Sequence, residues 1–479
     1  MSAGRIIKSY MQENQDRTKI PLKRVIGLPT SILLVAGIMI GSGVFKKITP
    51  MSRSLMSEHY ILWVWIAAGV ITMFSAFTYS GFANMTDRTG GFYEYLRLMY
   101  GDFLAFLYGW SVFTIIGSGS IAALAFVFSQ SADAIFHFGN LLPSHSDFSI
   151  AHFIYPFQNL SIKILAISMI ILLTWYNITG IKNSGILNNV VTAAKILGIL
   201  LLIIAGLLYS GEPVKVLQNG SSYHPVSGAA LYSGFFGALI SALWAFDGWS
   251  IVSFVSGEIK NPEKNLPYAI IGGISIVTIL YILLNYVYMQ VFSVELLASI
   301  PDHKIAAAVV SETLFGNVGS TLILVLIFIS TFGALTGCII TYPRISFRMA
   351  QEKVFFRKAA FVHPVFKTPY IALIYSCVWS SVLVITGTFD QLTDLIVVCG
   401  YSFTVLSAAG LIKMKSQKKI TSKVIGYPVI PVIVILFSLT LVITTLIVNT
   451  RDSLIGLLLT FSGIPFYFWF KKQSLNSNA

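Results

Sequence analysis

The chain has 479 residues, of which 56% are hydrophobic and only 11% are charged, and its mean hydropathy is +0.79. Soluble domains average roughly 45–50% apolar and about 25% charged residues, so the composition excludes a soluble globular enzyme. The net charge of +13 arises mainly in short connections between apolar runs, with no basic stripe among aromatic residues. We therefore expect a lipid bilayer around the protein and no nucleic acid partner.

Apolar runs follow one another along almost the whole chain. A bilayer core about 30 Å thick requires about 20 apolar residues per spanning helix, whereas barrel strands would show alternating segments of about ten. Open sheet edges cannot exist in hydrocarbon, so the predicted fold class is an all-α polytopic membrane protein. We predict about twelve spans, near residues 25–48, 60–84, 103–136, 161–178, 185–209, 229–256, 267–291, 317–341, 369–388, 392–412, 427–448 and 453–470.

The basic residues indicate the orientation. With the N-terminus placed inside, most of the 32 Lys and Arg residues fall on that side, as the positive-inside rule requires. Both tails, 1–24 and 471–479, are then cytoplasmic, in a plasma membrane or a bacterial inner membrane. The polar N-terminal tail leads into the first span without a signal-peptide cleavage site.

Motifs for catalysis and cofactor binding are missing from the sequence. The 7 histidines show no metal-ligand spacing, and there is no phosphate-binding glycine loop or Gly-x-Ser-x-Gly elbow. Cys338, Cys377 and Cys399 each lie inside an apolar run and are expected to be small core residues. The sequence predicts no enzyme, no metal site and no cofactor.

The first span is interrupted near its centre by Met39-Ile40-Gly41-Ser42-Gly43. Each glycine costs about 1 kcal/mol in a helix relative to alanine, so two glycines around a serine favour a break. Close helix packing is the alternative, because Gly37 and Gly41 form a Gly-x-x-x-Gly pair.

The sixth span has a similar interruption, and this favours a break over close helix packing in the first span. Trp244-Ala245-Phe246-Asp247-Gly248-Trp249 places an acid followed by glycine near the centre of another apolar run. A carboxylate at mid-bilayer costs roughly 2.5–3.5 kcal/mol, so such an acid usually faces a cavity or a partner. Interrupted spans at corresponding places in two halves indicate a secondary transporter built from inverted repeats, here 25–209 and 229–412, with two appended helices at 427–470.

A broken helix exposes backbone N–H groups at the start of one half and C=O groups at the end of the other. The N–H end suits a carboxylate, and the C=O end suits an ammonium group. Two broken helices side by side therefore predict a small zwitterionic substrate such as an α-amino acid.

Lys195 is the other charge within a span, early in the fifth run. Its side chain could extend to the cytoplasmic surface. Alternatively, its ammonium group lies where a sodium-coupled relative would bind Na⁺ and donates to carbonyls around the first break. The second reading predicts sodium-independent transport.

With these residues the chain resembles the amino acid, polyamine and organocation (APC) superfamily of transporters, and more closely its L-type amino acid transporter branch. The resemblance covers residues 25–370. It implies a five-plus-five inverted-repeat (LeuT-like) fold with broken helices 1 and 6, alternating access, and amino acid exchange or uptake. It rests on Gly41-Ser42-Gly43-Val44-Phe45, the Trp244–Trp249 segment, the connection 257–267, Ala194-Lys195 and the run from Phe332 to Arg344.

The resemblance also implies roles for the residues at the breaks. The N–H groups of Ser42 and Gly43 would hold the substrate carboxylate. The carbonyls of Met39, Trp244 and Asp247 would hold the amine. The Trp244 ring would cover the site as a gate, unless it only packs, and an apolar lining would favour neutral side chains. The rest of the predicted substrate site is Ile40, Gly41, Ala245, Phe246 and Gly248.

The chain departs from the family pattern at two places. Many animal members have glycine where this chain has Asp247, which could shape the site, bind a proton or contact a substrate amine. Animal members also join a glycoprotein heavy chain through a cysteine in the loop after the third span, but residues 137–160 contain no cysteine. We therefore expect no disulfide-linked partner.

The sequence thus predicts a sodium-independent transporter of neutral L-amino acids that works as an exchanger by alternating access. The first alternative is a proton-coupled symporter of the same fold, with Asp247 or Lys195 as the titrating group. The second is an amino acid receptor or sensor with a transporter-like fold.

Overall fold

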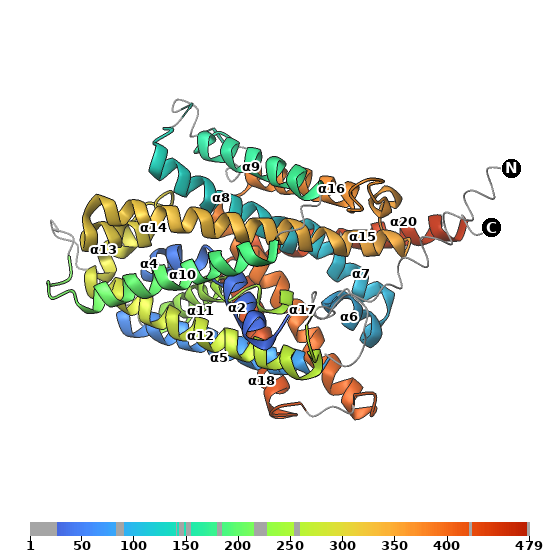
Figure 1. Ribbon diagram of the computed structural model, residues 1–479. Coiled ribbons are helices and arrows are strands. Elements are labelled where there is room, and N and C mark those ends of the chain that lie inside the picture. The colour runs from blue at the N-terminus through green and yellow to red at the C-terminus, as the bar shows by residue number, and fades with distance from the viewer. Residues whose placement is uncertain are drawn as a thin grey trace.

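The computed structural model describes residues 26–82, 91–139, 141–142, 148–149, 155–179, 184–214, 228–252, 259–420 and 424–476. Within these ranges the regular structure is helical, and β-type pairing is limited to isolated bridges at Ile26–Ile259 and Val214–Phe292. Most of the long helices run side by side along one direction and form an elongated bundle (Figure 1). The predicted tail 1–24 lies outside the described residues.

The helices confirm the predicted all-α polytopic fold. In the described part of the chain, 9 helices are long and apolar enough to cross a membrane, and the shorter apolar helices Leu28–Met39, Val191–Leu207 and Tyr370–Thr386 accompany them. In chain order the elements are α2 (Leu28–Met39), α3 (Gly43–Lys46), α4 (Ile48–Leu55), α5 (Glu58–Ser80), α6 (Phe92–Tyr100), α7 (Asp102–Ser111), the π-helix η1 (Val112–Ile116), α8 (Gly117–Phe136), α9 (Leu160–Ile178), α10 (Ser184–Leu207), α11 (Gly228–Ala245), α12 (Pro262–Val291), α13 (Val294–Ser299), α14 (Ala306–Thr341), α15 (Pro343–Gln351), the 3₁₀ helix η4 (Arg357–Ala360), α16 (Tyr370–Thr386), α17 (Phe389–Ser416), α18 (Val429–Val448), α19 (Thr450–Phe461) and α20 (Gly463–Asn476).

Two predicted spans differ from the observed helices. The first, expected at 25–48, is divided into α2, α3 and α4, so the chain beyond the break continues as short helices to Leu55. The eighth, expected at 317–341, begins earlier, at Ala306, but Gly316 has a non-helical backbone (φ 68°, ψ −165°) that divides α14. Glycine adopts positive φ without a steric penalty, so the predicted start of this span coincides with the kink.

Local sequence signals mark several helix ends. Pro29 and Pro343 lie in the first turns of α2 and α15, where the missing N–H of proline costs no hydrogen bond. Thr388 and Gln391 form a reciprocal capping box at the start of α17. The start of α17 is therefore well defined, and it contributes to the site described below.

Burial separates a central span from lipid-facing ones. The span Asp102–Phe136, which comprises α7, η1 and α8, is almost wholly buried in its apolar part, whereas α9 and α18 are buried over about a third. Large side chains such as Trp63, Trp175 and Leu208 are exposed on the outside of the bundle. In a bilayer these apolar surfaces contact lipid, which explains why the helices outside the centre are apolar on most faces.

The two broken helices meet at their breaks. α2 ends at Met39 and α3 begins at Gly43, while α11 ends at Ala245. A Cβ atom added to Gly43 would stand 2.5 Å from the Cβ of Ala245, closer than real Cβ contacts allow. Gly248 has φ +98°, and a Cβ added there would stand 2.7 Å from Ile38 Cγ2. Each break therefore packs against the other helix through a glycine.

Gly43→Ala should destabilise the protein by about 1–3 kcal/mol, because the new methyl group overlaps the backbone of Ala245. The measurement is thermal unfolding of the protein purified in detergent. Gly337→Ala in α14 is the matched control, since a Cβ added there has no atom within 4 Å, and its stability should be unchanged or slightly higher. Equal unfolding temperatures for the two variants would contradict the close contact between the breaks.

Candidate functional site

The first break leaves backbone donors free at the start of α3. Residues 40–42 are non-helical, and the N–H of Gly41 donates to Met39 O at 2.7 Å. Among the described residues, no backbone carbonyl accepts from the N–H of Ser42 or Gly43. The Ser42 hydroxyl is also buried, with no hydrogen-bond partner in this part of the chain. These donors together suit a small anionic group such as a carboxylate.

The second break follows the end of α11. After Ala245 the chain turns through residues 246–248 and continues as a short 3₁₀ segment at 249–252. The N–H of Asp247 donates to Trp244 O at 3.1 Å. Phe246 is buried, whereas Asp247 is partly exposed to an internal cavity. The acid that the sequence placed at mid-bilayer therefore faces a cavity rather than lipid.

A tyrosine that the sequence did not single out joins the two breaks. Tyr281 of α12 is fully buried, and its hydroxyl oxygen lies 2.8 Å from Met39 O and 3.0 Å from Ala245 O. Its single proton can serve only one of these carbonyls at a time. Met39 O, which the resemblance assigns to the substrate amine, therefore already has two neighbouring donors, Tyr281 and the N–H of Gly41.

Lys195 of α10 places its ammonium group beside the first break. Nζ donates to Gly37 O at 3.0 Å and to Ile40 O at 3.1 Å. Ser330 of α14 also donates to Ile40 O, at 3.3 Å. Lys195 is only 3% exposed, so its side chain does not extend to the surface. The carbonyl groups freed at the end of α2 therefore have a resident cation.

Aromatic and basic side chains lie beyond Trp244, toward the end of the bundle that carries α4 and α13, here called the α4 end (Figure 1). The Trp244 ring packs edge-on against Phe389, the first residue of α17, with 6.4 Å between ring centroids. Lys46 Nζ and Lys47 Nζ lie 4.6 and 4.8 Å from the centroid of the Phe389 ring. Ammonium groups at these distances attract the ring face, so they hold Phe389 next to Trp244.

Hydrogen bonds fasten the same two lysines to neighbouring helices. Lys47 is fully buried and donates to Asp390 Oδ1 and Thr393 Oγ1 of α17, both at 2.7 Å. Lys46 donates to Gln130 Oε1 of α8 at 2.8 Å. α3, the half-helix beyond the first break, is therefore tied to α8 and α17 at the α4 end.

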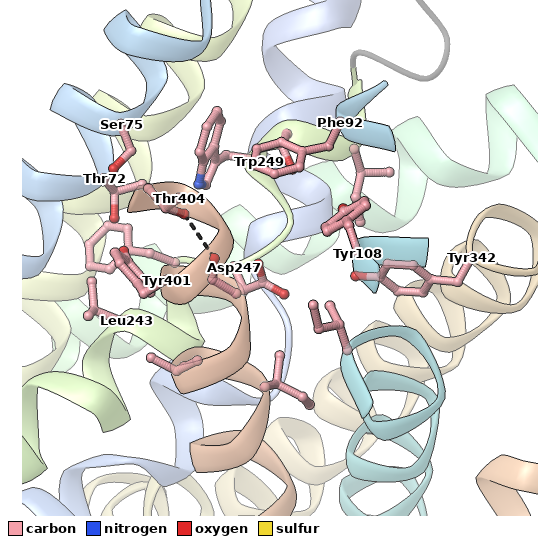
Figure 2. A pocket seen from close by; sticks show the side chains of 17 residues that line it. Thr72, Ser75, Phe92, Tyr108, Leu243, Asp247, Trp249, Tyr342, Tyr401 and Thr404 are labelled. Carbon is pink, nitrogen blue, oxygen red and sulfur yellow. Dashed lines mark hydrogen bonds between the residues drawn. The ribbon is translucent and has the colours of Figure 1, made fainter. Parts of the chain in front are cut away.

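A cavity of about 110 Å³ lies on the other side of the second break (Figure 2). A single water requires roughly 10–15 Å³ of such volume, so the cavity has room for several waters or a small solute. Figure 2 shows Asp247 between Tyr401 on one side and Tyr108 and Tyr342 on the other. The third, eighth and tenth spans contribute Tyr108, Ile116, Tyr342, Ile396, Val397, Gly400, Tyr401 and Thr404 to the lining.

The predicted site residues are brought together, but they do not all line this cavity. Of the predicted set, Phe246 and Asp247 line it, whereas the others lie at the facing breaks beside it. Sequence reasoning missed Tyr281 and the three cavity tyrosines, because each is one aromatic residue among many in an apolar run. It also missed the π-helix η1, which brings Ile116 to the cavity. Short π segments often occur at functional sites, but no local motif in the sequence marks this one.

The Lys47–Asp390 pair provides a test of how firmly α3 is held to α17 at the α4 end. Asp390→Asn should lower the unfolding temperature by several degrees, because the buried Lys47 ammonium group loses the carboxylate that it contacts directly. Lys47→Gln combined with Asp390→Asn should be more stable than the sum of the single changes implies. Thermal unfolding of the four proteins measures this coupling.

The exposed pair Arg53–Asp302 at the same end provides the control, and Asp302→Asn should have little effect. Strictly additive changes in unfolding temperature at Lys47 and Asp390 would show that this ion pair does not stabilise the protein.

A family model described as amino acid permease matches residues 26–467. The serine/threonine exchanger SteT of Bacillus subtilis is 30% identical over 457 residues, covering 94% of this chain and 98% of SteT. The b(0,+)-type amino acid transporter 1 of Mus musculus is 29% identical, covering 94% and 88% of the two chains. The large neutral amino acids transporter small subunit 2 of Mus musculus is 28% identical, covering 94% and 81%.

These relatives are transporters rather than enzymes, and they confirm the resemblance on which the sequence analysis relied. The matched region extends over nearly all the described helices. The chain belongs to the amino acid permease family of the APC superfamily and is a multi-pass membrane transporter of amino acids.

Proposed function

We propose that this protein exchanges neutral L-amino acids across a cell membrane without sodium, by alternating access around the two breaks. The observation that carries the proposal is the position of Lys195 Nζ, 3.0 and 3.1 Å from two carbonyls at the first break. A fixed ammonium group bound to these oxygens leaves no charge deficit for a sodium ion to fill. Exchange also agrees with the activity in the name of the Bacillus subtilis relative, a serine/threonine exchanger.

Substrate recognition in this proposal uses the backbone. The N–H groups of Ser42 and Gly43, which have no carbonyl partner among the described residues, hold the carboxylate, and the Ser42 hydroxyl, also without a partner there, lies beside them. The carbonyls of Met39, Trp244 and Asp247 hold the amine, so Tyr281 must release Met39 O when substrate arrives. No charged side chain is required for either group.

The residues around the two breaks would contact the substrate side chain and form the gate. Ile40, Ala245 and Phe246 supply an apolar lining, which favours neutral side chains. Gly41 adds no side chain at the first break, and Gly248 lets the second break pack against Ile38, so the backbone of both breaks stays close to the substrate. The Trp244 ring, backed by Phe389, covers the site from the α4 end.

The proposal also covers the orientation of the protein in the membrane and its partners. The positive-inside rule places both termini in the cytoplasm, so the α4 end faces outward and the opposite end, which carries α6 and α15, faces the cytoplasm. One relative is named a small subunit. In this chain residues 137–160 contain no cysteine, and Cys338, Cys377 and Cys399 lie within α14, α16 and α17. We therefore expect no disulfide-linked heavy chain.

The direct test uses sodium-free proteoliposomes at one pH, with labelled alanine, serine and leucine supplied outside. Vesicles preloaded with the same amino acids should take up label, because each inward step requires an outward step of bound substrate. Empty vesicles should remain near the background of protein-free vesicles. Equal uptake into empty and preloaded vesicles would exclude obligatory exchange.

Lys195→Met should lower the exchange rate about ten- to hundredfold, because the break loses the two hydrogen bonds that position it. The rate should be the same in sodium chloride and in choline chloride for the unmodified protein. Lys163→Met is the matched control, since Lys163 is also a buried lysine that donates to two carbonyls, but at Tyr155 and Ile385. Sodium-stimulated uptake by the unmodified protein would contradict the proposed role of Lys195.

A proton-coupled symporter remains a second candidate because Asp247 faces the cavity among Tyr108, Tyr342 and Tyr401. An inward pH gradient should then drive uptake into empty vesicles. Asp247→Asn should abolish that uptake but should leave the exchange of label into preloaded vesicles unchanged. Under our proposal, the pH gradient has no effect on empty vesicles.

A further inference from the structure

Five aromatic rings gather next to the cavity on the side of α6, and we call them the inner ring cluster. Tyr79 and Phe82 come from the end of α5 and the residues just after it, Phe92 and Tyr95 from α6, and Trp249 from the segment after the second break. The Tyr79 ring centroid lies 5.9 Å from Phe92 and 5.4 Å from Trp249. Tyr95 lies 5.5 Å from Tyr79 and 5.3 Å from Phe82. The cluster thus joins three segments that are distant in sequence.

The inner ring cluster lies where the cavity continues toward the α6 end of the bundle. Phe92 and Trp249 line the main cavity, and Figure 2 shows them side by side above Asp247. They also line a second space of about 20 Å³, together with Tyr79 and Phe82. Ser407, which lines that second space, has a buried hydroxyl with no partner among the described residues. A buried hydroxyl without a partner beside these rings would gain a hydrogen bond if water filled the path at another stage of transport.

α6 presents two different faces. Phe92 and Tyr95, three residues apart, belong to the inner ring cluster, whereas Glu94 and Arg97, also three residues apart, face α15. Residues at this spacing share one side of a helix, so the same short helix carries rings on one side and charges on another.

The charged side of α6 is fastened to α15 and the residue after it. Glu94 is only 2% exposed, and one of its oxygens lies 3.3 Å from Arg348. Glu352 accepts from Tyr93 Oη at 2.8 Å and also from Arg97, and it lies 3.1 Å from Arg348. Burial and the neighbouring Glu352 carboxylate raise the pKa of Tyr93, which therefore remains a hydrogen-bond donor. α6 is held in place by this set of ionic contacts.

We propose that the inner ring cluster closes the substrate path at its cytoplasmic end, and that Glu94, Arg97, Arg348 and Glu352 hold its α6 half in place. Trp249 is the moving half, because it directly follows the second break at Gly248. Ring pairs separate without leaving an unpaired charge, which suits a contact that opens in every cycle. This inference rests on the proposed alternating access, and it names the residues that close the cytoplasmic side of the substrate path.

The test measures access to the cavity and needs no transport. In a background with Cys338, Cys377 and Cys399 replaced by alanine, Ser75→Cys reports on the cavity side of the rings, since Ser75 lines both spaces. Reaction of the purified protein with a maleimide should become about tenfold faster when Trp249→Ala is added. Phe92→Leu, which keeps an apolar side chain but removes a ring, should act in the same direction and covers the case in which Trp249→Ala does not fold.

Two controls distinguish opening of the inner ring cluster from a general loosening of the protein structure. Trp175→Ala removes an exposed tryptophan of α9 and should leave the labelling of Ser75→Cys unchanged. Ser241→Cys, buried in α11 on the other side of the second break, should label at the same rate with and without Trp249→Ala. Unchanged labelling of Ser75→Cys in both ring variants would overturn the proposal, and so would an equal rise at Ser241→Cys.

The ionic contacts are tested with the same reporter. Glu94→Gln keeps the shape of the side chain but removes its charge, and it should speed labelling of Ser75→Cys severalfold. Glu58→Gln, at an exposed position in the first turn of α5, is the matched control and should have no effect. If Glu94→Gln leaves the labelling rate unchanged, the ionic contacts do not hold the closure. A protein that shows this labelling pattern but no amino acid exchange would refute the proposed function and leave the closure intact.

Discussion

The structure depends on the need to satisfy backbone polar groups that a broken helix releases inside a membrane. Each such group costs several kcal/mol if it is left unpaired in hydrocarbon. At the first break, Lys195 and Ser330 satisfy Ile40 O, and Tyr281 serves Met39 O. The N–H groups of Ser42 and Gly43 are left without such partners among the described residues. Without substrate, the protein thus pairs these acceptors itself, with Tyr281 able to release Met39 O to a substrate amine, and it leaves donors for the carboxylate of the proposed substrate.

The two ends of the proposed path are closed by different chemistry. At the α4 end, the fully buried Lys47 contacts the partly exposed Asp390 behind Phe389 and Trp244. Among the described residues at the α6 end, aromatic rings meet across the path, and the charged contacts between α6 and α15 lie behind them. Breaking a buried ion pair is costly, whereas ring contacts separate more easily. In the proposed transport cycle we therefore expect the α6 end to open more readily than the α4 end.

Sequence reasoning predicted the parts of the site that carry strong local signals. The Gly-Ser-Gly segment, the acid before Gly248 and the intramembrane Lys195 each break a rule for apolar helices, so each could be recognised from sequence alone. The all-α fold followed from the continuous apolar runs. The twofold division at 25–209 and 229–412 stays a prediction.

The missed features depend on tertiary contacts that sequence does not display. Tyr281 acts through carbonyls contributed by two other helices, 242 and 36 residues away in the chain. The Lys47–Asp390 pair joins residues 343 positions apart. Lys46 and Lys47 lie at the end of the predicted first span, where the sequence shows only two adjacent basic residues, but burial against Phe389 gives them a structural role.

The central claim is that facing breaks recognise the ammonium and the carboxylate of one substrate through the backbone. The most direct measurement is competition against uptake of labelled alanine by unlabelled alanine, alaninamide and propionate. Alaninamide lacks the carboxylate and propionate lacks the amine. Our account predicts that alanine competes and that neither analogue does at the same concentration. Strong competition by either analogue would contradict recognition at both breaks.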